Sequence, residues 1–240
     1  MKIAMTIPSM WRHSNAYTKW LFPNADIVVP ESEREAYEEH YTNVITHPDD
    51  IKWLTPKLNR MMNYYFVEND YDCMFKLDDD ILKFANMQKS QYIYIREEER
   101  IKDIITQAAY MAKDLWTPLF TFNNHVDYRK YQAFKPFWFK TATKMWVYWV
   151  LKTDLRMDER MVLKQDIDFS MQVLNKHRIV YQDTRYWFTR KPTFWIKWWC
   201  SLYRTTDLEE ECIDALVRKW GKKNISKKRK NNSFTVDILF

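Results

Sequence analysis

The chain has 240 residues, and its composition of 46% hydrophobic, 29% charged and 17% aromatic residues excludes a disordered protein and allows a buried core. The formal net charge is +6, and the single glycine, Gly221, excludes the P-loop and the Rossmann fingerprint, which need several glycines around a bound phosphate. Three cysteines without C-x-x-C spacing exclude a Cys-rich zinc site, and the longest apolar run, residues 145–151, is too short to cross a membrane.

Short apolar runs alternate with helical patterns over the first 80 residues. We expect strands at 2–7, 26–29, 43–46 and 72–77, and a helical stretch over 31–41. Thr55 and Pro56 are typical of a helix start, with Thr55 as N-cap. Since the chain begins in a strand pattern and shows no signal peptide, we expect a soluble intracellular protein.

The second half of the chain continues this alternation with more aromatic strands. We expect helices over 97–115 and 166–177, and strands at 119–122, 133–139, 145–151 and 178–181. A last helix is expected over 207–220, with Asp207 as N-cap, Glu210 completing a capping box and Gly221 ending it. The pattern predicts an α/β fold, mostly parallel with antiparallel additions and flanked by helices. We expect one domain over residues 1–206, with the C-terminal helix and basic tail, residues 207–240, packed on it or extending from it.

Basic residues are concentrated near the C-terminal end. Residues 218–230 hold eight basic residues and no acidic one, so the remainder of the chain carries a net charge of −2. Such a run is either a solvated segment that aids solubility or an arm that binds a polyanion.

Three consecutive carboxylates, Asp78, Asp79 and Asp80, follow the apolar strand expected at 72–77. An acidic turn is the simpler interpretation. However, adjacent like charges at the end of a buried strand favour a bound cation, and ligands bind at the carboxyl ends of such strands. Ligation by oxygen alone indicates Mg²⁺ or Mn²⁺ rather than zinc.

Four motifs in this order resemble those of GT-A glycosyltransferases: IAMTIPS at 3–9, VVPESE at 28–33, FKLDDDI at 75–81 and QDIDFSMQVL at 165–174. The set looks most like the TET/JBP-associated glycosyltransferases, phage-type enzymes implied to add sugars to hydroxymethylated pyrimidines in DNA. The resemblance covers roughly residues 1–190 and implies a GT-A-like nucleotide-sugar-binding sheet. One departure is that many GT-A enzymes use a late histidine as third metal ligand, whereas no histidine follows His177.

The resemblance implies a metal-dependent hexosyltransferase with a UDP-sugar donor, a DNA acceptor and a place in the cytoplasm of an infected bacterial host. Asp80 and Asp78 would hold Mn²⁺ or Mg²⁺, and Asp78 and Asp79 would contact the nucleotide. Asp166 would be the general base and Asp168 its partner at the helix start, although simple helix capping remains an alternative for this pair. Further candidates for nucleotide contacts, each of which could also be an ordinary surface residue, are Pro8, Ser9, Arg12, His13, Pro30, Asn59 and Arg60.

Clusters of aromatic residues at 145–149 and 194–199 are typical of a core. Aromatic residues near Arg190, Lys191, Lys197 and Arg204 would also suit an acceptor molecule that consists of flat bases and phosphates. Together with the basic run, they favour DNA over a polysaccharide, lipid or protein acceptor. A non-catalytic nucleic-acid binder is the alternative from another class. No metal-ligand spacing links the histidines, so surface or hydrogen-bonded positions are expected for His40, His47, His125 and His177.

Overall fold

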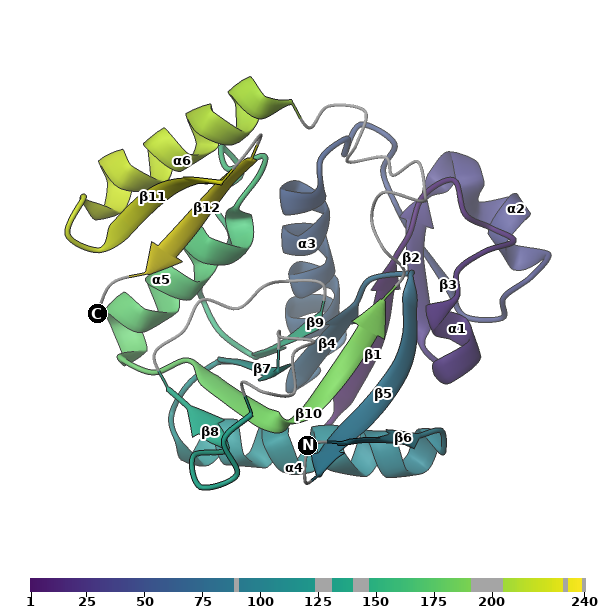
Figure 1. The fold of residues 1–240 in the computed structure, drawn as a ribbon. Coiled ribbons are helices and arrows are strands. Elements are labelled where there is room, and N and C mark those ends of the chain that lie inside the picture. The colour runs from purple at the N-terminus through teal and green to yellow at the C-terminus, as the bar shows by residue number, and fades with distance from the viewer. Residues whose placement is uncertain (89–90, 124–130, 140–146, 191–204, 231–232, 239–240) are drawn as a thin grey trace.

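The computed structural model describes residues 1–88, 91–123, 131–139, 147–190, 205–230 and 233–238. Most strands belong to one mixed sheet with the order β3-β2-β1-β4-β9-β7-β10-β5-β6, and the short strand β8 also pairs with β10 (Figure 1). A separate hairpin is formed by β11 and β12. The α/β fold expected from the sequence is therefore confirmed.

The first half of the sheet is parallel. It comprises β1 (Ile3–Pro8), β2 (Asp26–Pro30), β3 (Val44–His47) and β4 (Cys73–Leu77). β1 pairs in parallel with both β2 and β4, and β2 with β3. Because these four strands run the same way, their carboxyl ends meet at one edge of the sheet.

The second half is mainly antiparallel. β9 (Val147–Leu151) lies antiparallel between β4 and β7 (Leu119–Asn123), and β7 pairs in parallel with β10 (Tyr181–Arg190). β10 pairs antiparallel with β8 (Phe137–Trp138) and β5 (Ile81–Gln88), and β5 with β6 (Gln91–Ile95). The sheet is thus partly parallel, with larger antiparallel additions than the sequence pattern suggested.

Helices cover both faces of the sheet. On one face, α4 (Glu98–Asp114) packs its apolar side against Phe75 and Trp149, whose rings stack at 3.9 Å between centroids. On the other face, α3 (Leu54–Asn63), its π-helical extension (Tyr64–Glu68) and α5 (Gln165–His177) cover Met74 and Tyr148. Alternate residues of β4 and β9 therefore enter different cores, as the period of two in a strand requires.

Two short helical segments follow the first two strands. They are α1 (Thr18–Leu21), and a 3₁₀ turn (Glu31–Glu33) that continues into α2 (Arg34–Glu38). At the other end of the molecule, α6 (Thr206–Trp220) lies beside α5 and the hairpin of β11 (Ile225–Lys230) and β12 (Ser233–Ile238) (Figure 1). Met161, Met171, Leu216 and Ile225 form a small core there. Half of the basic run is thus a paired strand.

Several local predictions were wrong. The strand expected at 178–181 begins at Tyr181 and extends to Arg190, the strand expected at 133–139 is limited to β8, and β5 and β6 were missed. α3 begins at Leu54, and the Thr55 hydroxyl donates instead to the Met161 carbonyl at 2.7 Å. The N-cap of α6 is Thr205, whose Oγ1 accepts from the Leu208 amide at 3.1 Å. Distant contacts, rather than local propensity, decide these positions.

A search of the helices in the described ranges finds none with the length and apolar character needed to cross a membrane.

Candidate functional site

The carboxyl ends of β1 and β4 are joined by direct hydrogen bonds. Ser9, which follows β1, donates from Oγ to Asp79 Oδ2 at 2.7 Å, and Arg12 Nη1 donates to Asp79 Oδ1 at 2.6 Å. These three residues were candidates from the sequence, and the structure brings them together. Ligands of open α/β sheets bind at the carboxyl ends of the parallel strands, and this anchored acidic turn lies at such an end.

The loop after β1 is also fixed to the segment after β2. The Trp11 amide donates to Glu33 Oε2 at 2.7 Å, and the Arg12 amide donates to the Tyr37 hydroxyl at 3.0 Å. The Tyr37 hydroxyl lies 2.8 Å from Ser9 Oγ, and burial raises the pKa of this phenol, so it remains a hydrogen-bond donor. A chain of hydrogen bonds therefore runs from Arg12 through Tyr37 and Ser9 to Asp79. Sequence analysis missed Tyr37, because nothing distinguishes it from a core aromatic residue.

Thr18, at the start of α1, holds the backbone of the acidic turn. Its amide donates to the Asp79 carbonyl at 3.2 Å, and its Oγ1 accepts from the Ile81 amide at 2.8 Å. The turn therefore has a fixed shape between β4 and β5, and this shape directs the three carboxylates differently.

The three carboxylates have different environments. Asp79 is held by Arg12 and Ser9, and Asp78 forms an ion pair with the fully buried ammonium of Lys76. Asp80 is fully buried, and neither of its oxygens has a hydrogen-bond partner among the described residues. Burial, followed by the charges of Asp78 and Asp79, raises the pKa of Asp80 to about 8. Asp80 is therefore the carboxylate that most needs an external cation.

The donor chemistry of this turn fits a hard divalent ion in part. Two unpartnered carboxylate oxygens on Asp80 are suitable ligands for Mg²⁺ or Mn²⁺. The sequence also predicted Asp78 as a ligand, but in this structure its Oδ1 is paired with Lys76. Within the described ranges, no group of three or more His, Cys, Asp or Glu side chains is arranged to hold a metal.

Asp166 lies in the first turn of α5. Its Oδ1 accepts from the Ile167 amide at 2.9 Å, which is a local contact at the helix start. After burial, the charges of Asp78 and Asp166 both raise the pKa of Tyr148, which pairs with Lys76 across β4 and β9. Charges at the acidic turn and at the start of α5 therefore both affect the pKa of one buried phenol, although nearly 90 residues separate them in the sequence.

Asp168 has a different environment from Asp166. It is fully buried, and it accepts from Lys219 Nζ and Trp220 Nε1, each at 2.8 Å, and from Gln172 Nε2 at 2.9 Å. Lys219 also contacts Asp158 at 2.9 Å. These contacts connect α5 to α6, and they engage a lysine that the sequence assigned to the basic run.

The remaining candidates are spread along the sheet edge and beyond it. Pro8 and Pro30 end β1 and β2 at this edge. Asn59 instead exchanges two hydrogen bonds of 2.9 Å with the Met157 backbone, and Arg60 pairs with Glu68. His13 stacks on His40 with ring centroids 5.8 Å apart. Asn59 and Arg60 thus show contacts away from the acidic turn.

Two buried groups at this edge were not candidates for the site in the sequence analysis. Lys57 is buried, and its Nζ lies 3.5 Å from the Ser9 carbonyl oxygen. His47 ends β3 with a 1% exposed side chain, and its Nδ1 lies 2.9 Å from the Pro48 carbonyl oxygen. The sequence predicted either a surface or a hydrogen-bonded position for His47, and the hydrogen-bonded alternative is confirmed. Burial, and then the charge of Lys57, lowers the pKa of His47 to about 4.

Several sequence candidates lie outside the described residues. They are His125, Lys191, Lys197, Arg204 and the aromatic cluster at 194–199.

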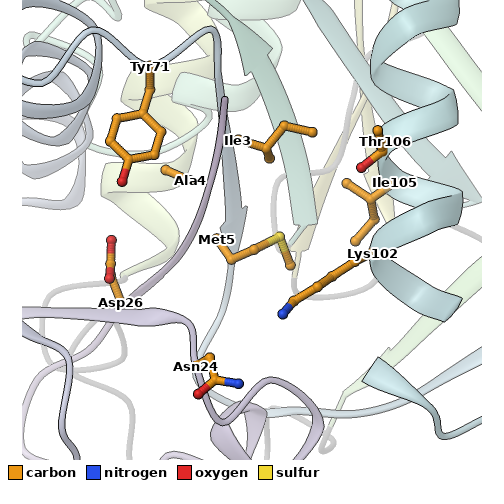
Figure 2. Close-up of a pocket in the computed structure, with 9 residues that line it drawn as sticks. All are labelled: Ile3, Ala4, Met5, Asn24, Asp26, Tyr71, Lys102, Ile105 and Thr106. Atoms are coloured by element: carbon orange, nitrogen blue, oxygen red, sulfur yellow. The ribbon is translucent and has the colours of Figure 1, made fainter. Parts of the chain in front are cut away.

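A cavity of about 320 Å³ opens at the opposite end of the parallel strands. Asn24 and Asp26 line it from the start of β2, Tyr71 from the segment before β4, and Lys102 and Ile105 from α4 (Figure 2). The Asp26 carboxylate accepts from the Tyr65 hydroxyl at 2.8 Å. Because this cavity lies at the amino ends of the strands, it does not belong to the site around the acidic turn.

Comparison with known proteins supports the fold. No family model and no curated protein matches the sequence. Among solved structures, glucosyl-3-phosphoglycerate synthase from Mycobacterium tuberculosis, in complex with Mg²⁺ and UDP, is similar with a TM-score of 0.54 and 8% identity, over 99% of this chain and 87% of that one. A197 from STIV has a TM-score of 0.43 and 10% identity over 80% and 86% of the two chains. CMP:2-keto-3-deoxy-manno-octonic acid synthetase has a TM-score of 0.40 and 14% identity over 77% and 89%.

At these identities the likeness concerns the fold, and only the first structure is similar enough to carry an argument. The chain has a mixed, partly parallel α/β sheet flanked by helices, and its fold is GT-A-like. The fold thus resembles that of glucosyl-3-phosphoglycerate synthase.

Proposed function

We propose that this chain is a metal-dependent glycosyltransferase that moves a sugar from a UDP-sugar to a 5-hydroxymethylated pyrimidine base in DNA. The observation that carries the proposal is Asp80, a fully buried carboxylate with two unpartnered oxygens at the carboxyl edge of a GT-A-like sheet. A buried carboxylate without a partner is costly, and a divalent cation removes that cost.

In the donor half of the site, each residue has a distinct role. Asp80, with Asp78 as a second candidate ligand, would hold Mn²⁺ or Mg²⁺, which when bound supplies a Lewis acid against the charge of a leaving diphosphate. Arg12 and Ser9 hold Asp79 beside it, so that Asp79 and the backbone at Pro8 and Pro30 can line the nucleotide. The solved GT-A-like neighbour is in complex with Mg²⁺ and UDP, which supports a uridine nucleotide as the donor class.

In the acceptor half, Asp166 is the better candidate for the general base. Its charge and that of Asp78 both raise the pKa of the same buried phenol, Tyr148, whereas the Asp168 carboxylate accepts from three donors. A base must reach the acceptor hydroxyl whose proton it removes, and a carboxylate engaged by Lys219 and Trp220 cannot easily do so. Asp168 is therefore assigned to the position of α5 rather than to the reaction.

The DNA acceptor is inferred from the sequence rather than from the acidic turn. It follows from the sequence resemblance to phage-type DNA base glycosyltransferases, which also implies the cytoplasm of an infected bacterial host, and from the eight basic residues in 218–230. A polysaccharide, lipid or protein acceptor would use the same donor half. A non-catalytic nucleic-acid binder would have no use for the unpartnered Asp80, and this disfavours that alternative.

One assay separates these alternatives. The full chain is incubated with radiolabelled UDP-sugars and with hydroxymethylated, unmodified or heat-denatured DNA, in Mn²⁺ or in excess EDTA. We expect label in hydroxymethylated DNA only, and only with metal. Asp70→Asn is the matched control, since this exposed carboxylate pairs with Lys152 beyond the other end of β4. Metal-dependent hydrolysis of UDP-sugar without labelling of DNA would support the proposed donor and metal, and it would contradict DNA as the acceptor. Full transfer in excess EDTA would contradict the proposed requirement for a divalent metal.

A further inference from the structure

The cavity at the amino ends of the parallel strands is a gap in the sheet itself. β1 pairs with β4 from Ile3 onward, but its pairing with β2 begins only at Thr6, opposite Asp26. Among the described strands, residues 3–5 therefore have a neighbour on one side only, and these three residues line the cavity (Figure 2). The cavity thus meets a strand edge whose backbone N–H and C=O groups are not paired in the sheet.

The segment before β2 is held in a turn and does not continue the strand into this gap. The Ala25 amide donates to the Phe22 carbonyl at 3.1 Å, and Lys19 Nζ donates to the Ala25 carbonyl at 2.7 Å. The first residue of the chain is also engaged, since the Met1 amino group donates to the Tyr110 hydroxyl at 3.2 Å. The gap is therefore part of the folded structure, and beside residues 3–5 it has the length of about 10 Å of extended chain.

Asp26 supplies an acidic group at the β2 end of the gap. Its Oδ2 accepts from the Tyr65 hydroxyl at 2.8 Å, whereas its Oδ1 has no hydrogen-bond partner among the described residues. Burial raises the pKa of this carboxyl group, and the Tyr65 hydrogen bond and the charge of Lys19 oppose that effect. Figure 2 shows the Tyr71 hydroxyl directed toward it. A half-buried carboxylate with one oxygen open to a cavity favours a ligand that brings positive charge and hydrogen-bond donors.

The α4 side of the cavity is less suited to an anion. Lys102 lines it, but its Nζ is paired with Glu98 Oε1 at 3.0 Å and lies 3.4 Å from Glu99 Oε1. Ile3 and Ile105 add apolar surface to the lining. The lining as a whole therefore favours a ligand with an ammonium group at one end and an apolar body.

We infer that this gap binds the amino-terminal end of an extended peptide, which adds a short strand beside residues 3–5 of β1. The backbone of such a peptide pairs with the open strand edge, which is the general mode of strand addition. The direction of the peptide follows from the charge of Asp26. A peptide parallel to β1 would bring its terminal carboxylate against Asp26, whereas an antiparallel peptide places its α-ammonium there. The antiparallel direction is therefore assigned, at the end of the strands opposite to the proposed transferase site.

The experiment compares alanyl-leucyl-alanine amide, which has a free amino terminus, with its N-acetylated form, which has no charge there. Binding of each peptide to the full chain is measured by calorimetry at neutral pH and one fixed salt concentration. Asp26→Asn keeps an acceptor for Tyr65 and removes the charge. Asp103→Asn is the matched control, because it removes an exposed charge from α4 outside the cavity lining. Thr106→Phe reduces the volume of the cavity and leaves Asp26 in place.

In wild type and Asp103→Asn, we expect the free amino terminus to bind about 10- to 150-fold more tightly than the acetylated form, the range for one hydrogen bond to a charged group. Asp26→Asn should remove most of this difference, and Thr106→Phe should weaken both peptides. Equal affinities of the two peptides for wild type, or no binding of either, would overturn the inference.

Binding of the free amino terminus that persists in Thr106→Phe would place the peptide outside the cavity and would also overturn the inference, even where Asp26→Asn fails to fold. Binding of UDP in Mn²⁺ by the same proteins tests the proposed function separately. We expect it to be unchanged in Asp26→Asn and Thr106→Phe, because the acidic turn lies at the other end of the parallel strands.

Discussion

Two carboxylates, Asp80 in the parallel half of the sheet and Asp168 at the start of α5, are equally buried but differ in every contact. Asp168 accepts hydrogen bonds from Lys219, Trp220 and Gln172, whereas Asp80 has no partner for either oxygen among the described residues. A satisfied buried carboxylate connects parts of a fold, and an unsatisfied one costs stability until a ligand arrives. Burial alone therefore does not identify a functional acid, whereas the partners of its oxygens do.

The largest expected effect is on metal-dependent activity. Asp80→Asn should reduce transfer on the order of 10³-fold or more, because it removes a charged ligand of the cation. The same substitution should leave the melting temperature of the metal-free protein unchanged or higher, because it removes a buried carboxyl group whose oxygens have no hydrogen-bond partner among the described residues. Transfer assays and thermal melts in EDTA check the two effects, and a marked loss of stability would mean that Asp80 is structural like Asp168.

Asp166→Asn should reduce transfer by about 10²–10⁴-fold, the effect of losing a general base. Binding of UDP in Mn²⁺ should stay within a few-fold of wild type, because the donor half of the site is unchanged. Kinetics and calorimetry on the same preparation separate these effects. An active Asp166→Asn beside an inactive but folded Asp168→Asn would exchange the roles of the two residues.

Asp168→Ala should reduce the free energy of unfolding by about 2–3 kcal/mol, less than the loss of a fully buried pair, because Lys219 is partly exposed and can be hydrated again. Denaturant unfolding measures this change. Asp154→Ala is the control, since Asp154 is exposed and its pair with Lys176 on α5 should contribute little. Equal stability of the two variants would remove the contrast between Asp80 and Asp168.

The basic run should affect DNA affinity rather than turnover. Lys219 is excluded from this test because it contacts Asp158 and Asp168. Substituting the six basic residues within 222–230 by Gln should flatten the slope of log K against log salt by about 0.9 for each phosphate that the variant no longer neutralises, or about 3.6 for four phosphates on duplex DNA. Affinity titrations at several salt concentrations measure the slope, and an unchanged slope would make the run a solubility feature.

The smallest expected effect is a pH dependence of stability at His47. Its pKa is lowered from 6.5 to about 4 in the folded state, first by burial and then by Lys57. The folded state therefore binds the proton less tightly than the unfolded state, and stability present above pH 6.5 is lost as the pH falls toward 4. His47→Gln should show a shallower loss of melting temperature over this window, whereas parallel curves for variant and wild type would contradict the assignment.

The position of the acidic turn follows from the local sequence alone. An apolar strand followed by three aspartates has one simple solution, in which the strand is buried and the acids emerge at its carboxyl end. Hydrophobic periodicity likewise placed α3, α4, α5 and α6 to within a few residues, because a one-sided apolar pattern is a local property of the chain.

The partner of each acid, by contrast, depends on the tertiary structure. Lys76 lies two residues from Asp78, but Arg12 is 67 residues from Asp79, and Lys219 is 51 residues from Asp168. Such pairings depend on which strands and helices become neighbours, and no local pattern encodes that choice. The left-handed Trp11, the buried His47 and the cap at Thr205 have the same origin, because each is held by the packing or hydrogen bonding of its surroundings. The local pattern placed the acids, and long-range packing left Asp80 available for a ligand while it engaged Asp168.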